Sequence, residues 1–161
     1  MPVLLLLALS PPLAARSPDH AGNVSTIGAI TVTYDAPIWE AALQTDKATY
    51  VPGEPVAMKL TLTNRSAFPV TLHFPTNCEA FYRVAAADGS LVYDARSQST
   101  CHAVHTERTW QPNQTVTYHW TWTQVNDAGQ QVPVPGDYRM RGFMDSVEEV
   151  PEPERSITIE P

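Results

Sequence analysis

The chain has 161 residues, which is enough for one domain of ordinary size with its own hydrophobic core. Ten Lys plus Arg against seventeen Asp plus Glu give a net charge of −7. Because binding to phosphates needs a basic surface, this charge excludes a nucleic-acid-binding role. Hydrophobic residues make up 43 % of the chain and charged residues 17 %, a balance that favours a packed globule over a disordered chain.

The N-terminus begins with an apolar run, residues 3–9, followed by a serine, two prolines and the small pair Ala14 and Ala15. Such a run is too short to anchor a folded protein in a bilayer, and the small residues after it suit a signal peptidase. The pattern predicts that residues 1–22 are a secretory signal peptide with a short linker, so that the protein is exported and has no membrane span. The two prolines disfavour the alternative, a buried N-terminal segment.

From residue 23 onward, apolar residues alternate with polar ones, and turns rich in proline and glycine separate the alternating runs. Alternation turns one face of each run inward and the other toward water, as in an antiparallel sheet. We therefore predict that residues 23–161 form a single all-β domain, an antiparallel sandwich of about eight short strands. The predicted strands lie at residues 30–34, 56–63, 70–74, 82–86, 91–93, 116–122, 138–140 and 157–159.

Three turns of one kind each precede a predicted strand: Pro52-Gly53, Pro112-Asn113 and Pro135-Gly136. Proline fixes the first turn dihedral and Gly or Asn accepts a positive φ at the next, which predicts type II turns. Asp88 and Gly89 predict a hairpin. A turn of helix is predicted at residues 39–43. The acidic, proline-spaced segment 147–155 is predicted to be a solvated connection before a last edge strand.

The two cysteines, Cys78 and Cys101, are an even number in a chain predicted to reach an oxidising compartment, where a disulfide persists. We predict that they form one disulfide, which stabilises the fold by about 3 kcal/mol in the chain-entropy model. Cys101 also begins a Cys-His-x-x-His cluster with His102 and His105, and thiolates and imidazoles are ligands for zinc or copper. Since a disulfide removes the thiolate, we expect no metal site and no cofactor.

No motif of catalysis is present in the sequence: it has no Gly-x-Ser-x-Gly elbow, no phosphate-binding glycine loop and no His-Glu-x-x-His pair. We therefore expect a protein that is not an enzyme. Its densest aromatic group, Trp120 and Trp122 with Tyr118, shares one strand face with Val116. In a sandwich such a face packs into the core, and the alternative is an exposed platform for sugar or peptide.

The segment 94–108 lacks apolar alternation and is predicted to be a long loop tethered by Cys101. A loop that is already rigid in its bound shape raises the affinity of an inhibitor. The candidate contacts with a partner protein are Arg96, Ser97, Gln98 and Ser99. For a contact residue, Arg96→Ala would weaken inhibition of a trypsin-like proteinase without changing the melting temperature. The alternative is a plain connection that the disulfide holds in place.

Several stretches follow one another at a defined spacing: residues 46–56 (DKATYVPGEPV), 60–66 (LTLTNRS), 69–75 (PVTLHFP), 88–93 (DGSLVY), 120–122 (WTW) and 127–138 (DAGQQVPVPGDY). Together they cover residues 43–142, and this region resembles the BsuPI-type intracellular proteinase inhibitor domain. The resemblance implies an immunoglobulin-like β-sandwich and inhibition of a serine proteinase. It supplies no reactive-site residues.

These observations predict an exported, monomeric immunoglobulin-like module that works by binding another protein. The resemblance implies that the bound protein is a serine proteinase. The leader departs from the family, whose founding activity is described as intracellular. A non-inhibitory structural or interaction module of the cell envelope is the alternative.

Overall fold

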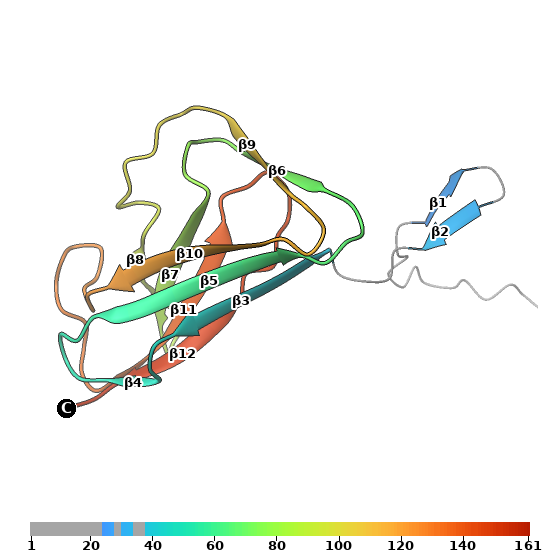
Figure 1. Cartoon of the computed structure of the whole chain (residues 1–161). Coiled ribbons are helices and arrows are strands. Elements are labelled where there is room, and N and C mark those ends of the chain that lie inside the picture. The colour runs from blue at the N-terminus through green and yellow to red at the C-terminus, as the bar shows by residue number, and fades with distance from the viewer. Residues whose placement is uncertain (1–23, 28–29, 34–37) are drawn as a thin grey trace, which may run out of the picture. The chain divides into compact units, whose positions relative to one another are not determined.

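The computed structural model describes residues 24–27, 30–33 and 38–161 (Figure 1). The signal peptide predicted for residues 1–22 lies outside these residues. Within the described part of the chain, no helix is long and apolar enough to cross a membrane.

The chain divides into two compact units, Met1–Asp35 and Ala36–Pro161. The described part of the first unit is an antiparallel hairpin of β1 (Val24–Ile27) and β2 (Ile30–Thr33). The strand predicted at residues 30–34 thus corresponds to β2. The sequence predicts that the sandwich begins at residue 23, whereas the second compact unit begins at Ala36.

The described part of the second unit, residues 38–161, contains ten strands in two main sheets and a ribbon (Figure 1). The three-stranded sheet has the antiparallel order β10 (Thr115–Trp122), β5 (Val56–Asn64), β3 (Trp39–Thr45). The five-stranded sheet has the order β4 (Thr49–Tyr50), β12 (Glu154–Ile159), β11 (Gly136–Met144), β7 (Ala80–Ala86), β8 (Leu91–Asp94). The ribbon pairs β6 (Val70–Phe74) with β9 (Thr106–Trp110). The all-β, immunoglobulin-like sandwich predicted from the sequence is therefore confirmed.

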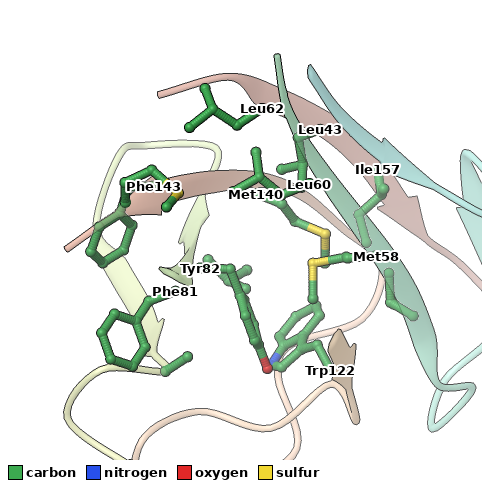
Figure 2. Packing of buried hydrophobic residues seen from close by; sticks show 14 of the residues in the cluster. Leu43, Met58, Leu60, Leu62, Phe81, Tyr82, Trp122, Met140, Phe143 and Ile157 are labelled. Atoms are coloured by element: carbon green, nitrogen blue, oxygen red, sulfur yellow. The ribbon is translucent and has the colours of Figure 1, made fainter. Parts of the chain in front are cut away.

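Alternation along the strands places the core between the sheets (Figure 2). In β5, Val56, Met58, Leu60 and Leu62 are each at most 2 % exposed, while Ala57 on the other face is exposed. The facing five-stranded sheet also contributes a buried residue at every second position, namely Tyr82, Val84, Tyr138, Met140, Ile157 and Ile159. Burying large apolar side chains on both inner faces is the main force that joins the two layers.

The two sheets come into direct contact at Gly142 of β11. A Cβ atom at this position would lie 3.2 Å from Cδ1 of Leu60 and 3.4 Å from Cδ1 of Leu43, both on the three-stranded sheet. The missing side chain therefore lets two leucines rest on the backbone of β11. Trp122 and Tyr138 also meet across the layers, with ring centroids 5.7 Å apart in an edge-on arrangement.

Two strands lie where the sequence predicts other structure. The predicted helical turn at 39–43 is wrong, because these residues belong to β3. Trp39 and Leu43 are buried and Ala41 packs with them, and a spacing of four residues fits either a helix or one face of a strand. The predicted loop 94–108 is shorter than expected, because β9 begins at Thr106.

Two further predictions on pairing need correction. The last strand, β12, is an edge strand only in its first part, because Thr158 and Ile159 at its end pair with the two residues of β4. That pairing is parallel, so the five-stranded sheet is mixed and not wholly antiparallel as predicted.

The predicted turns fall into two groups. Gly53 has φ of 79°, Asn113 has φ of 62° and Gly89 has φ of 87°, so all three take the left-handed backbone that the turn motifs require. Gly136 does not, and the predicted type II turn there is wrong. A Cβ atom at Gly136 would lie only 2.9 Å from the Tyr138 ring, so this glycine is needed for a close approach.

The connection from β11 to β12 is fastened to β6 by His73 and Glu148. The His73 backbone N–H donates to Glu148 Oε2 at 2.9 Å, and His73 Nδ1 lies 2.6 Å from Glu148 Oε1. The predicted solvated connection is thus tied to a strand at this point. The hydrogen bond to Glu148 raises the pKa of His73 above 6.5, and the bonds from the backbone and ring of His73 lower the pKa of Glu148 below 4.5.

We expect the stabilising effect of His73 to depend on pH. A raised histidine pKa contributes stability below pH 6.5 that is lost as pH rises through the raised value, and a lowered carboxyl pKa contributes stability that is lost as pH falls below 4.5. The stability difference between the wild type and His73→Gln should therefore be largest between pH 4.5 and pH 6.5. Urea unfolding at a series of pH values measures it, and a difference that does not vary with pH would contradict the assignment.

Candidate functional site

The loop between β8 and β9, residues 95–105, is the segment that the sequence singles out; we call it the tethered loop. Apart from Ala95, which is buried, and Cys101, which is half-buried, its residues are exposed. Its two ends are fixed by β8 and by β9. An exposed loop of this length can serve as a rigid contact surface only if other contacts hold it in one conformation.

A disulfide between Cys78 and Cys101 joins the tethered loop to the connection between β6 and β7, as predicted. Two hydrogen bonds lie beside it: Asn77 N–H donates to the His102 carbonyl at 3.2 Å, and His102 N–H donates to Asn77 Oδ1 at 2.8 Å. The Thr106 hydroxyl, at the start of β9, donates to the Thr76 carbonyl at 3.0 Å. The second half of the loop is therefore fastened at Cys101 and His102 and again at Thr106.

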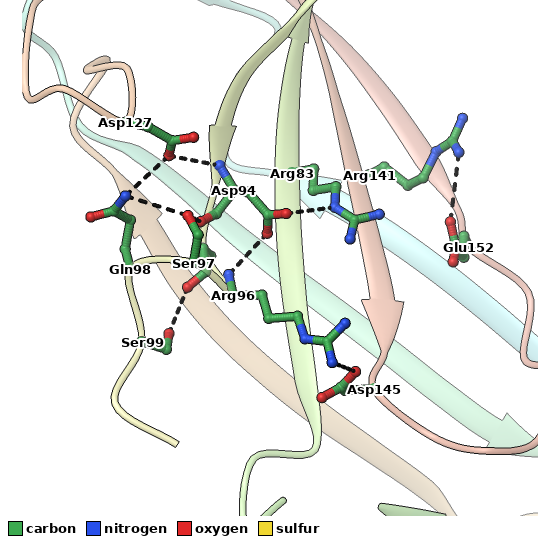
Figure 3. Close-up of polar contacts among 11 residues, drawn as sticks. Arg83, Asp94, Arg96, Ser97, Gln98, Ser99, Asp127, Arg141, Asp145 and Glu152 are labelled. Atoms are coloured by element: carbon green, nitrogen blue, oxygen red, sulfur yellow. Dashed lines mark hydrogen bonds and ion pairs between the residues drawn. The ribbon is translucent and has the colours of Figure 1, made fainter. Parts of the chain in front are cut away.

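Asp94 and Asp127 hold the first half of the tethered loop (Figure 3). Asp94 Oδ2 accepts a hydrogen bond from Arg83 Nε and Oδ1 accepts one from the Arg96 backbone N–H, both at 3.0 Å. Asp127 Oδ1 accepts from the Asp94 backbone N–H at 3.0 Å and from Gln98 Nε2 at 3.4 Å. The two carboxylates accept hydrogen bonds from both backbone N–H groups and side chains, and they fix the turn at the start of the loop.

Two of the four predicted contact side chains bind backbone carbonyls where the loop leaves β8. The Ser97 hydroxyl donates to the Asp94 carbonyl at 2.8 Å, and the Ser99 hydroxyl donates to the Ala95 carbonyl at 2.6 Å (Figure 3). These bonds close a compact turn at the start of the loop. The structure thus gives both serines a role in shaping the loop.

The third predicted contact residue, Arg96, is paired with a carboxylate. Its Nη2 lies 3.1 Å from Oδ1 of Asp145 (Figure 3), and the Asp145 side chain is only 10 % exposed. The other Asp145 oxygen, Oδ2, is buried and takes no hydrogen bond from the residues that the structure describes. Arg96 is therefore the group that compensates a buried acid.

We expect Arg96→Ala to lower the free energy of unfolding by about 1–2 kcal/mol, because it leaves Asp145 without its cation. This replaces the sequence-based expectation of an unchanged melting temperature. Thermal and urea unfolding measure the change. In the background of Asp145→Asn, which removes the buried charge, the same substitution should cost much less, and equal costs in both backgrounds would contradict the pairing.

Residues 102–105 form the exposed apex of the tethered loop. Val104 is 55 % exposed, although it is apolar, and its backbone N–H donates to the His102 carbonyl at 2.7 Å. His102 and His105 are exposed beside it. Cys101 is in the disulfide, and the described residues contain no group of three or more His, Cys, Asp or Glu side chains arranged to hold a metal.

The predicted aromatic face of β10 is only partly in the core. Val116 and Trp122, at the two ends of the face, are buried as predicted. Tyr118 and Trp120, between them, pack on the core but remain half-exposed. The face therefore combines a core contact with an accessible aromatic surface.

Comparison with known families identifies the chain. A family model described as "BsuPI: Intracellular proteinase inhibitor" matches residues 43–149, more than half of the sequence. The chain belongs to the BsuPI family. The matched region of this BsuPI protein includes both cysteines and the whole tethered loop, and the family implies a proteinase as its protein partner. The resemblance noted over residues 43–142 is thus confirmed.

No curated protein matches the sequence. Several solved structures are similar to this BsuPI chain at low identity. They include a β-glucosidase from Erythrobacter marinus (12 % identity, TM-score 0.46, 81 % of this chain and 16 % of that chain) and the sporulation control protein Spo0M from Bacillus subtilis (15 %, 0.44, 78 % and 51 %). A CARDB domain from Pyrococcus furiosus is another (12 %, 0.44, 80 % and 98 %). The chain corresponds to only a part of the first two proteins.

Proposed function

We propose that this protein inhibits a serine proteinase and that the tethered loop is the segment that enters the proteinase's substrate cleft. The family supports a proteinase as the partner. The observation that carries the assignment to the loop is its exposed apex, residues 102–105, held between the disulfide at Cys101 and strand β9 at Thr106. We further propose that the protein acts as an exported monomer, in keeping with its disulfide.

Fixation of both ends explains how such a loop could inhibit. A flexible loop loses conformational entropy when a proteinase binds it, whereas an apex that is already fixed loses little. The same fixation keeps the ends of the segment together, which slows release and disfavours productive cleavage. Arg96, Ser97, Gln98 and Ser99 flank the apex and complete the proposed contact surface.

A panel of trypsin-like and subtilisin-like proteinases at stoichiometric inhibitor tests the proposal. The decisive variant is Val104→Asp, which places a charge at the apex, and its matched control is Val147→Asp, at a residue that is 74 % exposed outside the loop. We expect Val104→Asp to weaken inhibition by about tenfold or more, as is common for a contact at the centre of an interface. Val147→Asp should inhibit like the wild type.

Two results would overturn the proposal. Equal inhibition by Val104→Asp and the wild type would remove the apex from the contact. Digestion of the wild type by every proteinase in the panel, or no effect on any of them, would favour the alternative of a cell-envelope module that inhibits nothing. Unchanged melting temperatures of both variants exclude unfolding as the cause of a loss.

A further inference from the structure

An aromatic hollow of about 520 Å³ lies beside the tethered loop. Strands β7 and β8 of the five-stranded sheet line one side, and β10, an edge strand of the three-stranded sheet, lines the other. Gln98 and Ser99 of the tethered loop also line it, and the disulfide reaches it through Cys78. The hollow is thus a surface distinct from the loop apex.

Four rings line the hollow as a continuous series. Tyr93 stacks on Tyr82, Tyr82 meets Trp120, and Trp120 stacks on Tyr118, with centroid distances of 5.6, 5.6 and 6.2 Å. Tyr82 is buried and packs with the core residues (Figure 2), whereas the other three rings of the hollow are half-exposed. Aromatic faces carry a partial negative charge, so half-exposed rings favour a cation above them.

Glu79 is the charged residue among the described residues that line the hollow. Its Oε2 accepts hydrogen bonds from the Tyr118 hydroxyl at 2.6 Å and from Arg108 Nη1 at 2.7 Å. Burial, and then the bond to Glu79, raise the pKa of Tyr118, so its hydroxyl keeps the proton that it donates. Glu79 Oε1 takes no hydrogen bond from the described part of the chain, and the side chain is 28 % exposed. One oxygen is therefore free to bind a ligand.

The protein already combines arginine, an aromatic ring and a carboxylate twice. The guanidinium carbon of Arg83 lies 4.3 Å from the Phe143 ring centroid, and its Nε donates to Asp94. The guanidinium carbon of Arg108 lies 5.3 Å from the Trp110 ring centroid, and Arg108 Nη1 donates to Glu79. Planar guanidinium groups stack on rings and bind carboxylates through their edge.

We propose that the aromatic hollow binds an arginine side chain of a partner protein. The guanidinium stacks on Trp120 and donates to Glu79 Oε1, which repeats on a ligand the arrangement that the fold builds internally. The carboxylate, the ring faces and the net charge of −7 all complement a basic segment. Gln98 and Ser99 border both proposed surfaces, but the contacts with the guanidinium come from Trp120 and Glu79, outside the tethered loop, so the site does not depend on the proposed inhibition.

Nuclear magnetic resonance of the whole protein with a capped Gly-Ala-Arg-Ala-Gly peptide tests the site. The matched probe replaces arginine by citrulline, which has the same shape and no charge. The chain has four tryptophans, so each indole N–H gives its own signal. We expect the arginine peptide at millimolar concentration to shift the Trp120 signal and to leave those of Trp39 and Trp110 unchanged.

Three variants then test the contacts. Trp120→Ala and Glu79→Gln should each weaken peptide binding by about tenfold, the size expected of one stacked or charged contact. Phe68→Ala is the control, since this aromatic residue is 60 % exposed outside the hollow, and it should bind like the wild type. Glu79→Gln also touches Arg108, so melting temperatures establish that each variant is folded.

Several outcomes would overturn the proposal. Equal binding of the citrulline peptide would show that the guanidinium is not recognised. A Trp120 signal that responds to a neutral oligosaccharide and not to the arginine peptide would assign the hollow to carbohydrate. An unmoved Trp120 signal would remove the site altogether. Since no proteinase is present, failure of the loop to inhibit leaves this measurement unaffected.

Discussion

Gln124→Ala is expected to lower the free energy of unfolding by about 3 kcal/mol or more. The side chain is fully buried and binds three backbone groups of one turn. Its Nε2 donates to the carbonyls of Val51 and Glu54 at 2.9 and 2.8 Å, and its Oε1 accepts from the Gly53 N–H at 2.8 Å. Alanine leaves these groups without their partner and leaves a cavity.

Two further variants test whether the loss of hydrogen bonds, and not backbone strain, causes the destabilisation by Gln124→Ala. Gln124 has φ of 60°, so any backbone strain is shared by alanine and glutamine and does not explain a difference. Gln124→Glu keeps the size but cannot donate to two carbonyls when ionised, so it should destabilise at least as much as alanine. Gln130→Ala, at an exposed position, should have little effect. Urea unfolding measures all three, and a small loss for both changes at Gln124 would contradict the role of its hydrogen bonds.

Replacing both cysteines, Cys78→Ser with Cys101→Ser, is expected to cost about 3 kcal/mol of stability and to weaken inhibition as well. The crosslink closes a loop with a sequence separation of 23, so its loss frees the unfolded chain. In the native state, the hydrogen bonds between Asn77 and His102 remain, but the apex loses its covalent anchor.

Reductant supplies the control for the cysteine variant. Dithiothreitol should lower the stability and the inhibitory strength of the wild type to the level of the double variant, and should leave the double variant unchanged. Urea unfolding and proteinase titration measure both quantities. Full inhibition by the double variant would show that the anchor is not needed by the loop, and the proposed mechanism would then be wrong.

Strand prediction succeeded where large apolar residues alternate and failed where they do not. Val56 to Leu62 carry a large apolar residue at every second position, so periodicity alone identifies β5. In β9, the inward positions are Thr106, Arg108 and Trp110, and the Arg108 guanidinium lies over the tryptophan ring where an aliphatic side chain would be expected. A prediction from alternating apolar residues misses such a strand, because polar side chains occupy most of its inward positions.

The candidate site was predictable only in part. An even number of cysteines in a chain with a leader-like start pointed to the disulfide, and the absence of apolar alternation pointed to the loop. The anchoring acids were not found, because Asp127 and Asp145 lie far along the chain from Arg96 and Gln98. Pairing of that kind depends on the fold, and isolated polar residues carry no periodic signal.

The short pairing of β4 with β12 has a consequence for association between copies. Among the described residues, β4 pairs with Thr158 and Ile159 and no strand pairs with the earlier part of β12 on that side, so this part is an edge of the sheet. Exposed Glu154 and Arg155 stand along that edge. Charged side chains on an open strand repel or hydrate an incoming neighbour, so the growth of fibrils by strand addition is disfavoured at this side of the sheet.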